Sequence, residues 1–256
     1  MTHAGLETTV QLLTLGAARA VPLVLAVPAL GGPALPIQLR LALGLGLSVL
    51  CLPLLAASPV VMGSLAGMLL LVREALVGVV MGFVVACVFR AAEAAGELTD
   101  LLRGTAFASV TSPAGDGRSS PLGALLFLLA SVVFLEIGGV GHVATALAHS
   151  YEAIPLAMPL HGEPARTAAT LAIIASGKLI EAAIGLAAPA MVALLLAEVA
   201  LGIIGRAVPR IPISTIGPSL RALLGLGAVL LAVGATDLAL QRGFRGFFDL
   251  LAMAFK

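Results

Sequence analysis

Long apolar runs alternate with short polar connections along this chain. None of the runs alternates polar and apolar residues as a half-buried strand does, and about 20 apolar residues are enough for a helix to cross a bilayer. Because lipid offers the backbone no hydrogen-bond partner, such runs predict helices. We therefore expect an all-α, polytopic membrane protein with long helical hairpins. Its six apolar segments are Val10–Leu30, Leu41–Val72, Ala75–Phe89, Leu122–Leu135, Thr170–Gly205 and Ala222–Thr236.

Prolines predict where these helices break. Leu41–Val72 is too long for one span and contains Pro53, Thr170–Gly205 contains Pro189, and Pro209 follows shortly after it. A proline removes one helical hydrogen bond and its ring clashes with the preceding turn. We expect breaks near all three prolines.

Composition supports the membrane interpretation. Hydrophobic residues make up 60% of the 256 residues and charged residues 11%, whereas an ordinary soluble domain has about 25% charged residues. The net charge of +1 gives no reason to expect nucleic acid. Cys51 and Cys87 are isolated, so they indicate neither a disulfide framework nor a metal site. The N-terminus lacks the basic region of a secretory signal, so we expect the first apolar segment to be retained.

Among the charged residues that interrupt or border the apolar segments, we single out four, because an ionisable residue inside a membrane is a candidate for function. They are Glu136, Lys178, Glu181 and Glu198. One interpretation is a proton relay through the three glutamates. The other, which we favour, is that these residues pair with partner subunits or lie beyond the hydrocarbon. Lys178 and Glu181 are three residues apart, so they share a helix face.

Two further patterns concern helix surfaces. Gly78-x-x-x-Gly82 has the spacing that lets two membrane helices approach closely. Glu93, Glu97 and Asp100 fall on one face of a predicted helix, which we interpret as wet or facing another subunit. The chain has no H-E-x-x-H zinc motif, no G-x-S-x-G elbow and no P-loop. We therefore expect no enzymatic activity and no cofactor or metal.

The stretch GTAFASVTSPAGDGRSSPLG, Gly104–Gly123, is the longest one with little hydrophobic content. Its glycines and prolines disfavour a helix, and its hydroxyl groups can hydrogen-bond in a wet space. From the residues alone, an exposed loop is the favoured interpretation.

Several pieces of the chain occur in a recognisable order: Arg19–Pro53, Arg73–Phe83, Ala95–Pro113, Ser119–Leu156 and Pro189–Leu226. Their order resembles the FliR/SctT family, the export-gate subunit of flagellar and injectisome type III secretion systems. Together the pieces cover most of the chain, although Arg210 stands where the family often has glutamine. The sequence SPLG, Ser120–Gly123, and the pair Ser150-Tyr151 favour the injectisome branch.

This resemblance implies a function. Residues 1–256 would form one export-gate domain in the bacterial inner membrane, joining FliP/SctR-like and FliQ/SctS-like subunits beside an FlhB/SctU-like switch protein. Unfolded secreted proteins would pass through the assembly. The loop at about 104–122 would close the empty channel as a plug, with Phe107 at the constriction beside methionines of neighbouring subunits. The implied plug residues are Phe107, Gly104, Thr105, Pro113, Gly115, Gly117 and Pro121.

Two alternatives remain open at this point. A small-solute secondary transporter would need internal repeats and a midplane site built from broken helices. A purely structural assembly subunit would take no part in the gate. Solute uptake would favour the first, and co-purification with two small hydrophobic subunits would favour the export gate.

Overall fold

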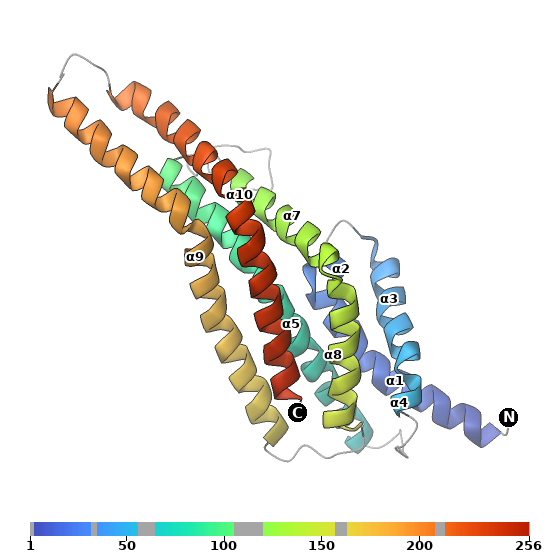
Figure 1. Cartoon of the computed structure of the whole chain (residues 1–256). Coiled ribbons are helices and arrows are strands. Elements are labelled where there is room, and N and C mark those ends of the chain that lie inside the picture. The colour runs from blue at the N-terminus through green and yellow to red at the C-terminus, as the bar shows by residue number, and fades with distance from the viewer. Residues whose placement is uncertain are drawn as a thin grey trace. The chain divides into compact units, whose positions relative to one another are not determined.

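The computed structural model describes residues 3–31, 35–55, 65–104, 120–156, 163–207 and 213–255, and every regular element in them is a helix (Figure 1). This confirms the predicted all-α class. In chain order the helices are α1 (His3–Ala26), α2 (Pro28–Gly31), α3 (Ile37–Leu50), α4 (Leu52–Leu55), α5 (Leu65–Arg103), α7 (Pro121–Glu136), α8 (Gly139–Ala153), α9 (Glu163–Ala207) and α10 (Ile213–Ala254).

The chain divides into two compact units, each built from separate stretches of sequence. The first unit comprises Met1–Cys87, Phe134–Gly177 and Phe244–Lys256, and the second comprises Val88–Val133 and Lys178–Gly243. Helices α5, α7, α9 and α10 contribute residues to both units. The single domain over residues 1–256 stays a prediction.

Four of the described helices, α1, α5, α9 and α10, are long and apolar enough to cross a membrane, and the α7–α8 pair makes a fifth if it counts as one span. The six apolar segments therefore do not correspond to six spanning helices. Arg73 and Glu74 separated Leu41–Val72 from Ala75–Phe89 in the sequence, yet both are buried inside α5. A charge ends a span only where it lacks a partner inside the protein, and these two have partners.

The proline predictions have different outcomes. The break near Pro53 is confirmed, because α3 ends at Leu50 and Pro53 lies in the short α4. The break at Pro189 is wrong, because α9 continues through it from Glu163 to Ala207. One proline removes a single hydrogen bond, whereas unwinding a helix in apolar surroundings would expose many more unpaired backbone groups. Pro209 lies outside the described residues.

The first unit packs α1 against its neighbours through small residues. A Cβ atom at Gly78 of α5 would fall on the carbonyl group of Arg19, and one at Gly82 would lie 2.8 Å from the Leu23 carbonyl oxygen. The Gly78-x-x-x-Gly82 spacing therefore marks a close helix contact, as predicted. A cluster of buried side chains lies beside this contact: Leu12, Leu15, Ala20, Cys51, Leu147, Tyr151 and Leu156.

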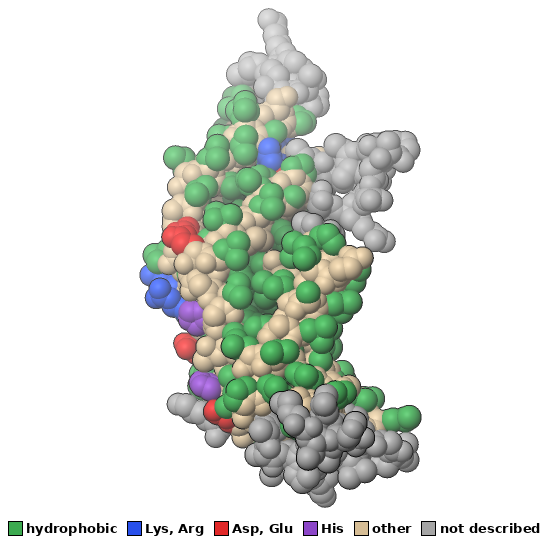
Figure 2. Space-filling view, turned by 90° about the vertical axis from the view of Figure 1, so that its right-hand side faces the viewer, with side chains coloured by type: hydrophobic (Ala, Val, Ile, Leu, Met, Phe, Trp, Pro, Cys, Tyr) green, Lys and Arg blue, Asp and Glu red, His purple; other side chains and the backbone are tan. Residues whose placement is uncertain are grey.

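The outer surface is largely hydrophobic. Figure 2 shows hydrophobic side chains over much of the described surface in that view, with charged and histidine side chains gathered in few places. Only 22% of the apolar span in α9, and 22% of that in α10, is buried within the chain. Leu231 of α10 is 91% exposed. A surface of this kind is covered by lipid or by other protein.

Candidate functional site: the base of the 105–119 segment

The two ends of the predicted plug are held together in the second unit. Gly104 follows the last residue of α5 with φ of 76°, the left-handed conformation that commonly ends a helix. Pro121 begins α7, where its missing N–H removes no hydrogen bond. The structure thus stops α5 and starts α7 on either side of residues 105–119. Thr105, Phe107, Pro113, Gly115 and Gly117 themselves lie outside the described residues.

Asp100 is the central residue of this base. It is 1% exposed, and its Oδ2 atom accepts a 2.9 Å hydrogen bond from the backbone N–H of Leu122. Ser120 Oγ accepts the next one, from the N–H of Gly123 at 2.8 Å. The first turn of α7 therefore has acceptors from both sides of the 105–119 segment. The prediction that Asp100 lies on a wet or subunit-facing face is wrong, because its carboxylate is needed inside the chain.

A backbone contact reinforces these hydrogen bonds. A Cβ atom at Gly96 of α5 would fall on the backbone of Leu122 and Gly123. On α7, a Cβ atom at Gly123 would lie 3.1 Å from the carbonyl oxygen of Glu93. Helices α5 and α7 touch through one glycine on each helix. The end of α5 and the start of α7 are therefore held at a fixed separation.

Arg103 extends the base to α10. Its Nη1 atom donates to Asp100 Oδ1 at 2.7 Å, and its Nε and Nη2 atoms donate to the carbonyl oxygen of Ala222 at 3.1 and 2.9 Å. The side chain passes over Gly225, where a Cβ atom would come within 2.5 Å of Arg103 Cδ. Helices α5, α7 and α10 of the second unit thus meet where the segment begins. We call Gly96, Asp100, Arg103, Ser120 and Gly123 the plug base.

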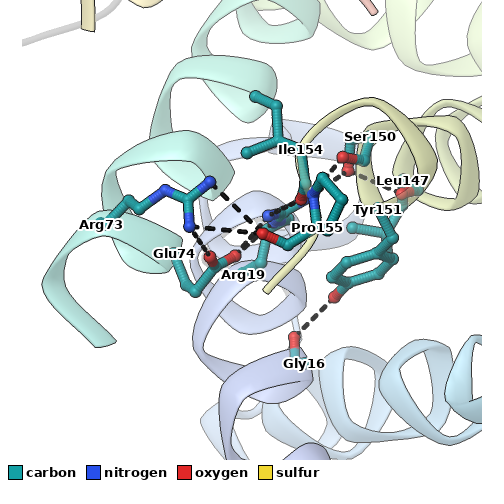
Figure 3. A network of polar contacts seen from close by, with 9 residues as sticks. All are labelled: Gly16, Arg19, Arg73, Glu74, Leu147, Ser150, Tyr151, Ile154 and Pro155. Carbon is teal, nitrogen blue, oxygen red and sulfur yellow. Dashed lines mark hydrogen bonds and ion pairs between the residues drawn. The ribbon is translucent and has the colours of Figure 1, made fainter. Parts of the chain in front are cut away.

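A second polar centre lies in the first unit (Figure 3). Arg19 of α1 and Glu74 of α5 have fully buried side chains and form an ion pair of 2.5 Å. Arg19 Nη1 donates to the Ser150 carbonyl oxygen at 2.7 Å and Nη2 to that of Ile154 at 2.9 Å, so this side chain caps the C-terminal end of α8. The guanidinium lies 4.4 Å from the centre of the Tyr151 ring.

Arg73 adds a second buried positive charge to this centre. Its Nη1 atom lies 3.5 Å from Glu74 Oε1 and donates to the Pro155 carbonyl oxygen at 3.4 Å. The Tyr151 hydroxyl donates to the Gly16 carbonyl oxygen at 2.8 Å, again joining α8 to α1. We call Arg19, Arg73 and Glu74 the buried arginine cluster. It fixes α1, α5 and the end of α8 together.

The sequence matches a known protein family along most of its length. The model of the family described as bacterial export proteins, family 1, matches residues 10–246. The chain belongs to this family. Both the plug base and the buried arginine cluster lie within the matched region.

Relatives are found in flagellar and in other export systems. The flagellar biosynthetic protein FliR of Escherichia coli is 28% identical over 235 residues, which are 91% of this chain and 88% of FliR. The Yop proteins translocation protein T of Yersinia pestis is 32% identical over 65% of this chain and 62% of its own length. The surface presentation of antigens protein SpaR of Shigella flexneri is 29% identical over 61% of this chain and 59% of its own length. Chains of this family are therefore components of protein export systems.

The structure brings the four predicted membrane charges into different surroundings. Glu136 is the exposed last residue of α7, and Lys178 and Glu181 lie one turn apart on α9. Glu198 forms an ion pair of 3.3 Å with Arg221, which joins α9 to α10 within the second unit. Glu181 and Glu198 are separated by about 25 Å along α9. This distance is too long for a direct proton transfer between the two glutamates.

The sequence did not predict the buried arginine cluster. Arg19 lies inside the first apolar segment, and Arg73 and Glu74 lie between the second and the third. The signal was present, because charges inside apolar helices are costly unless they are paired. Their sequence separation of 55 residues hid the pairing of Arg19 with Glu74.

Replacing Asp100 with alanine is expected to loosen the start of α7. The N–H of Leu122 would lose a charged acceptor in a buried position, which costs about 1.5–3 kcal/mol. Hydrogen exchange of the first turn of α7 should accelerate roughly tenfold to a hundredfold. Glu93→Ala is the matched control, since Glu93 forms an ion pair with Arg90, whose side chain is exposed. Equal exchange in the two variants would show that Asp100 does not hold the plug base.

Proposed function

We propose that this protein is a subunit of a type III secretion export gate, which helps form the channel through which unfolded proteins leave across the bacterial inner membrane. The match of the export-family model to residues 10–246 carries this proposal. Relatives that bear flagellar and Yop-translocation names support it. No observation favours a small-solute transporter.

The lengths of the helices support an assembly with other subunits. The apolar span of α9 has 42 residues and that of α10 has 38, which correspond to about 63 and 57 Å of helix. The hydrocarbon core of a bilayer is only about 30 Å thick. Lipid therefore cannot cover both exposed spans along their whole length, and other protein must cover the remainder. We infer that FliP/SctR-like and FliQ/SctS-like subunits do so, beside an FlhB/SctU-like protein.

The 105–119 segment is proposed to close the resting channel. The helices on either side of it are held together by the plug base. Phe107 is the large apolar side chain near its start, and apolar side chains close narrow passages by excluding water. We propose that Phe107 forms the constriction and that Gly104, Thr105, Pro113, Gly115, Gly117 and Pro121 shape the loop. Ion leak across the membrane is the readout that tests this.

Co-purification tests the export-gate proposal directly. The affinity-tagged chain should be expressed together with the FliP/SctR-like, FliQ/SctS-like and FlhB/SctU-like subunits from the same genome. We expect one stable complex that contains the tagged chain and at least the first two subunits. A tagged solute transporter of similar size, expressed in the same way, is the control. Recovery of this chain as a stable monomer, while the other subunits assemble without it, would contradict the proposal.

A further inference from the structure

The first unit carries a groove that the plug does not use. It lies between α8 and the last turns of α10 and has a volume of about 510 Å³. Its α8 side includes Gly138, Gly141 and Thr145, which recur at the spacing of helical turns. Small side chains at this spacing make a shallow floor about 11 Å long, or two turns of helix.

Polar side chains lie at the edges of this groove. The His142 ring stacks on Phe248, with 4.9 Å between ring centres and an angle of 23°. His149 and Asp249 also line it, and both are exposed. Within the part of the chain that the structure describes, Asp249 forms no ion pair. With neutral histidines the groove carries one formal negative charge.

We propose that this groove docks a helix of another export-gate subunit, one that presents a lysine or arginine to Asp249. This inference rests on the proposed function, since it requires the assembly to exist. The small floor residues let a helix backbone approach α8 closely, as membrane helices do. The carboxylate supplies the charge complement that fixes which helix docks and in which register.

Other occupants fit the groove less well. A lipid chain would fill the apolar floor and leave Asp249 without a partner in apolar surroundings, which is unfavourable. A second copy of this chain that docked through the same face would bring a second groove of the same charge toward the first, and like charges repel. A helix that carries a lysine or arginine can both pack on the floor and form an ion pair with the Asp249 carboxylate.

Filling the groove tests the proposal without disturbing the chain itself. A Cβ atom at Gly141 meets no other atom within 4 Å, so Gly141→Leu can add a side chain at the groove without a clash at its Cβ atom. Gly246→Leu is the matched control, because Gly246 is equally open, lies on α10 and does not line the groove. We expect Gly141→Leu to lower the amount of partner subunit recovered with the chain about tenfold. The control should recover as much as the wild type.

A crosslinking experiment on the complete complex identifies the occupant. A photoreactive amino acid at Thr145 should crosslink to a helix of another subunit that carries a lysine or arginine. Asp249→Lys should lower recovery of that subunit, and changing the identified basic residue to aspartate should restore it. Crosslinks only to lipid or to a second copy, or normal recovery with Gly141→Leu, would overturn the inference. If the wild-type chain recovers no partner subunit at all, the proposed function fails, and the inference fails with it.

Discussion

Replacing Arg19 with alanine is expected to lower the thermal midpoint of the assembled protein by roughly 10 °C. The substitution removes the ion pair with Glu74 and the hydrogen bonds to the end of α8. The fully buried carboxylate of Glu74 is then left with Arg73 alone. Breaking a buried ion pair by removing one partner costs about 3–5 kcal/mol. A loss of 1 kcal/mol shifts the midpoint by about 2–4 °C in a chain of this size.

Arg90→Ala is the matched control for this prediction. Arg90 also pairs with a glutamate, Glu93, at 2.6 Å, but its side chain is 62% exposed. An exposed ion pair contributes only about 0–1 kcal/mol, so this variant should melt close to the wild type. The midpoint of the purified complex in detergent is the measurement. Similar midpoints for the two variants would show that the buried arginine cluster does not hold α1, α5 and α8 together.

Features that depend on local spacing could be predicted from the sequence. The apolar runs predicted helices, because lipid and helix geometry leave the backbone few other states. Gly78 and Gly82 predicted a close helix contact, since four-residue spacing puts both on one face. The apolar run Leu122–Leu135 predicted a helix, and α7 covers it from Pro121 to Glu136.

Features that depend on distant partners could not be predicted in this way. Asp100 looked like part of an exposed carboxylate face, because nothing near it in the sequence shows that the N–H of Leu122 needs an acceptor. Arg19 and Glu74 looked like interruptions for the same reason. Pro189 looked like a break, because a local rule counts the lost hydrogen bond but not the many bonds that a 45-residue helix keeps.

Shortening the 105–119 segment is expected to make the resting membrane permeable to ions. Removing residues 108–117 leaves Asp100, Arg103, Ser120 and Gly123 in place, so the plug base and the assembly should survive. The shortened chain would no longer fill the passage, and water would enter a constriction that apolar side chains otherwise keep dry. Phe107→Ala should give the same leak in weaker form. Phe83→Ala, outside the segment on α5, is the matched control.

Potassium efflux from vesicles that contain the complete gate, with no substrate present, would show whether residues 105–119 close the channel. We expect tight wild-type vesicles, tight Phe83→Ala vesicles, and efflux that is faster by roughly tenfold or more when residues 108–117 are missing. The subunits recovered from each vesicle preparation must be the same. Intact complexes that lack residues 108–117 and still hold potassium as tightly as the wild type would contradict the claim that this segment closes the channel.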